Sequence, residues 1–164
     1  MPELSVNLDE LAFVLHRSPS LHLDCYLDLE TGNILNVPTD RKVLENLLPP
    51  EENSQMLSTD NMIEQLLPKG GNLLFIPDLF EQHVFKLMID FHKTLEEGEP
   101  ELAEQLFITI HGEGGYASFR KLIQKRYQLL KSFIRFRDSF FEQEAQTWLK
   151  QNNISAIPRE TNSQ

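Results

Sequence analysis

The sequence predicts an α+β fold, a single mostly helical domain over residues 1–154 that carries a small antiparallel sheet. Three observations lead to this class. Residues 21–29 alternate strictly between apolar and polar side chains and end in a turn, which is the pattern of a β-hairpin. From residue 78 onward, apolar residues recur at helical spacing. The 164 residues, 40% of them hydrophobic, suit one domain with a core of its own.

The first helix is expected after Asn7, because its side chain can accept from the first turn while Glu10 reaches back. A hairpin follows, in which Gly32 and Asn33 tolerate the positive φ of the turn and residues 34–37 return as the second strand. The polar side chains of the first strand are expected on a solvated face. The opposite, core-facing side consists of Leu21, Leu23, Cys25, Leu27 and Leu29.

The middle of the chain gives the weakest signals. Thr39 and Asp40 can cap a short helix that ends at Leu48, and residues 62–67 suit a second short helix. The run 72–76 is apolar, brief and followed by proline, so a third strand can join the hairpin there.

Three helical segments are expected in the second half. Asp78 begins the first, and its apolar stripe extends to Leu95. Pro100 suits the first turn of the second segment, which ends at Ile110. The glycine-rich sequence HGEGG at residues 111–115 separates the second segment from the third.

The third segment runs from Phe119 to Trp148, 30 residues without glycine or proline. One continuous helix of this length would measure about 45 Å. A domain of this size has a diameter of roughly 40 Å, so we expect a bend near residues 127–132. Residues 155–164 are expected to form a frayed tail.

Charge is sorted along the chain. The formal net charge is −10, and residues 1–100 hold six basic and 18 acidic side chains. The stretch 116–137 holds seven basic residues and no acid. On a helical wheel, five of the seven share one polar arc, which either meets acidic surface of the same chain or binds an anion such as nucleic-acid phosphate. This candidate anion or partner surface consists of Arg120, Lys121, Lys125, Lys131 and Arg135.

Residues with reactive side chains follow no catalytic or metal-binding pattern. Cys25, the one cysteine, lies among leucines and is expected to be a buried thiol. Asp24, Asp28 and Glu30 share one face of the strand, where alternate residues sit roughly 6.6–7 Å apart, a separation that inverting glycosidases use. A solvated hairpin face is the usual meaning of such alternation, so we favour it over catalysis. The five histidines lack metal-motif spacing, and HGEGG lacks the spacing of phosphate loops. We therefore expect no catalytic residue, cofactor or metal.

A cytoplasmic location is expected from two features. No apolar run reaches the roughly 18–20 residues that a membrane span requires. The N-terminal sequence MPELSVNLDELAF is acidic and lacks the basic region of a secretion signal.

Five segments together resemble a known bacterial family. They are YLDLETGNILNV (26–37), FIPDLFEQHVFKLMIDF (75–91), GGYASFRK (114–121), FIRFRD (133–138) and WLKQNNI (148–154). In order and spacing they are similar to the bacterial group known as uncharacterised protein family 0158. The resemblance implies a small mixed α and β fold in a bacterial cytoplasm, and it implies no activity.

Two functions remain open at this point. The first is a non-enzymatic interaction or regulatory protein that binds another protein or itself, in line with the charge sorting and with aromatic residues left over on the last helix. The alternative is nucleic-acid or other polyanion binding through the basic helix 119–135, which added salt would weaken steeply. The leftover aromatic residues are Phe136, Phe140, Phe141 and Trp148.

Overall fold

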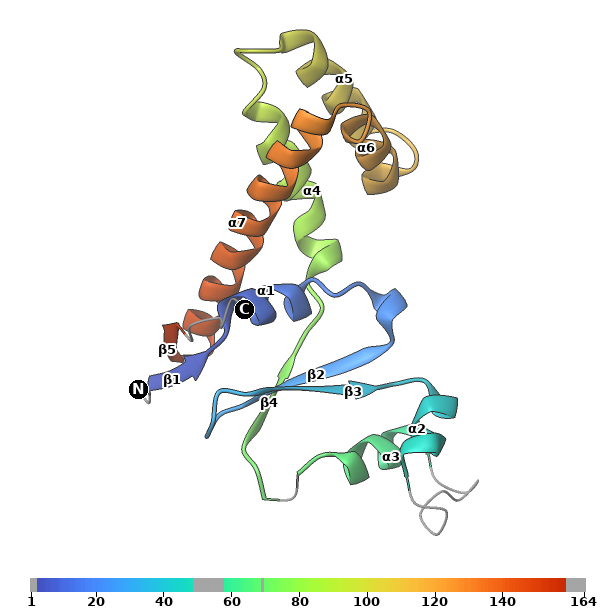
Figure 1. Ribbon diagram of the computed structural model, residues 1–164, viewed down its shortest axis with the longest axis vertical. Helices are drawn as coiled ribbons and strands as arrows, with labels where there is room; N and C mark the ends of the chain where they lie inside the picture. The colour runs from blue at the N-terminus through green and yellow to red at the C-terminus, as the bar shows by residue number, and fades with distance from the viewer. Residues whose placement is uncertain (1–2, 49–57, 69, 159–164) are drawn as a thin grey trace. The chain divides into compact units, whose positions relative to one another are not determined.

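The computed structural model describes residues 3–48, 58–68 and 70–158 (Figure 1). Contacts between residues divide the chain into two compact units. The mixed unit holds the chain up to Asp78 together with the chain from Ala145 on, and the helical unit is Leu79–Glu144. The mostly helical α+β class is confirmed, whereas a single domain over 1–154 stays a prediction.

The mixed unit contains the predicted antiparallel sheet. Strands β2 (Leu23–Asp28) and β3 (Ile34–Pro38) form the hairpin, and β4 (Leu73–Ile76) pairs with the other edge of β2. The strand order is therefore β3-β2-β4, which confirms the hairpin and the third strand. The strand that alternates most clearly in sequence lies in the centre of the sheet.

Helices cover both faces of this sheet. Figure 1 shows α1 (Leu8–Leu15) on one side and α2 (Arg41–Leu47) and α3 (Thr59–Leu66) on the other. The side chains of Val37, α2 and α3 form a buried cluster against which Tyr26 packs, and burial raises the pKa of its phenol. The polar face of β2, predicted to be solvated, is thus half-buried under α2 and α3.

The apolar face of β2 is the better-buried one. Cys25 and Leu27 have no exposed surface, as predicted, whereas Leu21 lies in the short 3-10 helix η1 (Pro19–Leu21) and is 46% exposed. Arg17 ties the end of α1 to the sheet: its Nη1 donates to Val14 O at 2.8 Å and its Nε donates to Leu23 O at 3.0 Å. The expectation for Leu21 was wrong because β2 begins only at Leu23.

A second, two-stranded sheet joins β1 (Glu3–Val6) to β5 (Ser155–Pro158) in parallel. Leu4 and Val6 are buried. Residues 155–158 are therefore a strand, not the start of a frayed tail, because their backbone pairs with the N-terminal strand. The rest of the predicted tail, 159–164, lies outside the described residues.

The helical unit consists of three helices and most of a fourth. A bend at 124–126 separates the last two, a few residues before the predicted stretch 127–132. The turns from Ala145 on belong to the mixed unit, where Trp148 is 6% exposed. The helices are α4 (Phe80–Lys93), α5 (Pro100–Ile110), α6 (Gly115–Ile123) and α7 (Tyr127–Gln151).

The core of the helical unit is aromatic. The ring of Phe91 on α4 lies 6.3 Å from Phe119 on α6 and 5.2 Å and 5.5 Å from Phe133 and Phe136 on α7, measured between centroids. Leu106 of α5 is fully buried in the same cluster. These contacts join all four helices of the unit around one side chain.

The tip of the hairpin presses against β1. Gly32 has φ +80°, and a Cβ at this position would overlap the carbonyl oxygen of Ser5. Gly70 has the same φ, but a Cβ there would meet no atom within 4 Å. The two glycines thus share one backbone conformation and differ in the space around them.

The matched pair gives a direct test of this contact. Gly32→Ala should lower the free energy of unfolding by more than about 2 kcal/mol, because it adds backbone overlap to the strain of a left-handed residue. Gly70→Ala should cost only about 1–2 kcal/mol, since it adds the strain alone. Urea unfolding measures both, and equal losses would contradict the close packing of β1 on the hairpin.

Candidate functional site

The bend between α6 and α7 divides the predicted basic surface. Residues 124–126 form a turn in which the amides of Lys125 and Arg126 donate to carbonyls of the preceding turn. One polar arc would require a continuous helix over 119–135, and the chain does not have it. α6 carries Arg120 and Lys121, the turn carries Lys125, and α7 carries Lys131 and Arg135.

Three of these cations are exposed on α6 and α7 and form no ion pair in the described part of the chain. They are Lys121, Lys131 and Arg135. Lys131 and Arg135 stand one helical turn apart on α7. The basic surface is therefore open on α7 and at the end of α6.

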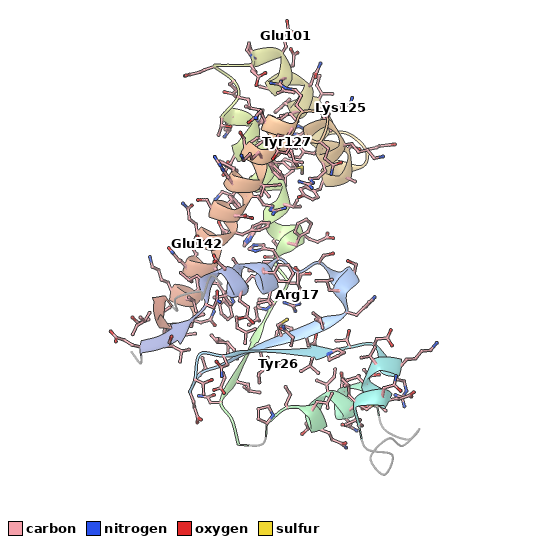
Figure 2. All side chains as sticks on the ribbon, viewed as in Figure 1. Arg17, Tyr26, Glu101, Lys125, Tyr127 and Glu142 are labelled. Carbon is pink, nitrogen blue, oxygen red and sulfur yellow. The ribbon has the colours of Figure 1, made fainter. Side chains whose placement is uncertain are left out.

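Lys125 has a different environment. It lines a groove of about 600 Å³ together with Glu99, Glu101 and Arg126. Arg126 Nη1 donates to Glu99 Oε1 at 2.7 Å, and Figure 2 shows Lys125 and Glu101 near the same end of the helical unit. Glu99 therefore neutralises Arg126, whereas Lys125 is exposed and forms no ion pair among the described residues although two carboxylates line its groove.

Arg120 is turned inward. Its guanidinium carbon lies 5.6 Å from the centroid of the Phe133 ring, a cation–π arrangement. Its Nη1 is buried and has no hydrogen-bond partner among the described residues. Arg120 therefore contributes more to packing between α6 and α7 than to an anion-binding surface.

A surface that sequence reasoning missed lies on α4 and α5. Phe85, Phe107 and Ile108 are 51%, 47% and 64% exposed. The ring of His111 lies 4.4 Å from the ring of Phe107 and 5.6 Å from that of Phe85, so the α4 and α5 side chains form one continuous patch. We call Phe85, Phe107, Ile108 and His111 the aromatic stripe.

A groove of about 410 Å³ adjoins the aromatic stripe between the two helices. Its floor is fixed by His92, whose Nδ1 donates to Ile89 O at 2.6 Å and whose ring lies 5.5 Å from that of Phe107. His92 is 5% exposed, so the groove rests on a packed side chain. The groove is lined by Ile89, His92, Lys93, Glu96, Pro100, Ala103, Glu104 and Phe107.

The sequence held a signal for this stripe. α5 buries Ala103, Leu106 and Ile110, yet Phe107 and Ile108 are also apolar, so the helix has more apolar side chains than one face can bury. The aromatic residues that the sequence suggested instead are not the exposed ones. Phe140 and Trp148 are buried, and Phe136 and Phe141 pack against the core.

Reactive side chains elsewhere have structural surroundings. Cys25 is fully buried, and burial raises the pKa of its thiol. His83 Nε2 lies 3.5 Å from Glu144 Oε2, which joins α4 to α7 within the helical unit. Across the described ranges, no three His, Cys, Asp or Glu side chains are grouped to hold a metal ion.

HGEGG forms the connection from α5 to α6. Gly114 has φ +89° and precedes α6, and a Cβ there would collide with the hydroxyl of Ser118, which donates to Glu113 O at 3.2 Å. Both the positive φ and the lack of space for a Cβ therefore explain a glycine at position 114 of this helix–helix turn.

Compared with known proteins, the chain matches no family model, no curated protein and no solved structure. Membership of uncharacterised protein family 0158 therefore stays a prediction. In the part of the chain that the structure describes, no helix has the length and apolar character needed to cross a membrane.

Replacement of Arg120 tests its inward role. Arg120→Met keeps an unbranched stem over Phe133 and removes the unpartnered Nη1, so the free energy of unfolding should stay unchanged or rise. Arg126→Met is the control, because it breaks an exposed ion pair worth at most about 1 kcal/mol. A loss above about 1.5 kcal/mol for Arg120→Met in urea unfolding would show that the cation–π contact with Phe133 outweighs the cost of the unpartnered Nη1.

Proposed function

We propose that this protein is a non-enzymatic binding protein whose helical unit docks a partner protein on the aromatic stripe. The observation that carries the proposal is the exposed pair Phe85 and Phe107, joined through the ring of His111, with the exposed Ile108 on the same helix as Phe107 and a groove beside them. Contiguous exposed apolar side chains are typical of interaction surfaces, and aromatic residues are enriched at their centres.

The basic residues support a second candidate, polyanion binding. Its supporting observation is the open position of Lys121, Lys131 and Arg135, which have no acidic partner among the described residues. Against it, Arg120 is turned inward, Lys125 shares its groove with carboxylates, and the whole chain carries a net charge of −10. A divided cluster on an acidic chain attracts phosphate weakly, so we favour protein binding.

The proposal keeps the regulatory, cytoplasmic role that the sequence suggests. A unit that presents an apolar patch on two packed helices can bind a partner without chemistry of its own.

Photo-crosslinking in the source cells tests the proposal. A benzophenone side chain at position 108 should give protein adducts that nuclease treatment leaves intact. The same group at Val43, an exposed apolar position of the mixed unit, is the matched control and should give few adducts. A third variant carries the group at Lys131.

Two outcomes would contradict protein binding at the stripe. One is equal adducts at positions 108 and 43, which would mean random collision. The other is a nuclease-sensitive adduct at position 131 with none at 108, which would make polyanion binding the leading function.

A further inference from the structure

We infer that the segment held on the aromatic stripe is an amphipathic helix with lysine or arginine beside its apolar face. This inference rests on the proposed function and names the chemistry of its partner. It follows from the shape of the surface, from the charges around it, and from the burial of the apolar side chains of the chain's own basic helices.

The shape of the surface suits a third helix. α4 and α5 are joined by a short connection over 94–99 and pack side by side, so the groove between them runs along two helices. From Phe85 to Lys93 the α4 side of this surface spans about 12 Å, or just over two helical turns. A helix laid there can place apolar side chains at positions i, i+3 or i+4 and i+7 into the groove.

Acidic residues outnumber basic ones at the groove and in the α5 segment beside it. Residues 96–113 contain six glutamates and no lysine or arginine. Glu96 and Glu104 line the groove itself, where Lys93 is the one lysine or arginine among the lining residues. Glu99 is engaged by Arg126, while Glu97, Glu101 and Glu104 have no ion pair in the described residues. A basic helix gains from this rim, and an acidic one is repelled.

The basic helices of this chain do not supply such a segment. α6 buries Phe119 and Ile123, and α7 buries Phe133, in the core of the helical unit. α2 presents the exposed apolar residues Val43 and Leu47 beside Arg41 and Lys42, but its seven residues cannot supply apolar side chains from i to i+7. The occupant is a helix of another protein.

The test uses labelled model peptides and the full-length chain. The probe is a fluorescent peptide of about 18 residues, or five turns, whose leucines follow the helical period and whose other residues are lysine. One control peptide replaces lysine by glutamate, and a second has the leucine–lysine composition in scrambled order. Fluorescence anisotropy near 150 mM salt, where charges more than about 8 Å apart are largely screened and those in contact still interact, should show binding of the probe and of neither control.

Variants of the chain locate the binding. Ile108→Asn should weaken the probe at least about tenfold, because the exposed Ile108 side chain becomes buried on binding. Phe13→Asn, at a 63% exposed position of α1, should leave the affinity unchanged. Glu104→Lys should also weaken the probe and reduce its advantage over the glutamate peptide.

Each result decides something. If the scrambled peptide binds as well as the probe, or Ile108→Asn has no effect on the affinity, the peptides bind through non-specific charge attraction and the inference is overturned. If the glutamate peptide binds better, the charge argument is wrong. If crosslinks at position 108 persist while the probe fails to bind, the proposed function stands and the basic-helix inference falls; if both fail, both are rejected.

Discussion

The packing of Phe91 is the contact on which the helical unit depends. Its ring meets Phe119, Phe133 and Phe136, and it is 2% exposed, so it fixes the rotation of α4 about its axis. At 100° per residue, Phe85 lies about 120° from Phe91 around the helix and therefore faces away from the core. The exposed aromatic stripe is thus a direct consequence of how the core is built.

The packing of this core also affects where the basic residues lie. The chain bends between α6 and α7, and both helices place apolar side chains in the cluster that contains Phe91. The bend separates the cations that one continuous helix would have aligned. Arg120 is drawn over Phe133, and Arg126 reaches Glu99. The basic arc that the sequence predicts is therefore divided in the structure. Arg120 points inward, Lys125 lies in a groove with glutamates, and Lys131 and Arg135 stay exposed on α7.

The sequence predicted those elements whose structure is determined by residues within the same short segment. Asn7 accepts from the amide of Glu10 at 3.0 Å, Pro100 occupies the first turn of α5, and the alternation around Cys25 marks the central strand. The parallel pairing of β1 with β5 could not be predicted, since each strand has four residues and its partner lies at the other end of the chain. The stripe was missed for a related reason: whether Phe107 faces a core or solvent depends on what packs against α5.

Chemical-shift mapping on the full-length, isotope-labelled chain tests the central claim most directly. Adding the leucine–lysine probe should shift the amide signals of α4 and α5 near residues 85–111, in proportion to the bound fraction, and leave those near Lys131 and Arg135 in place. Shifts centred on the basic residues, or spread evenly over both units, would contradict a binding surface set by the packing of Phe91.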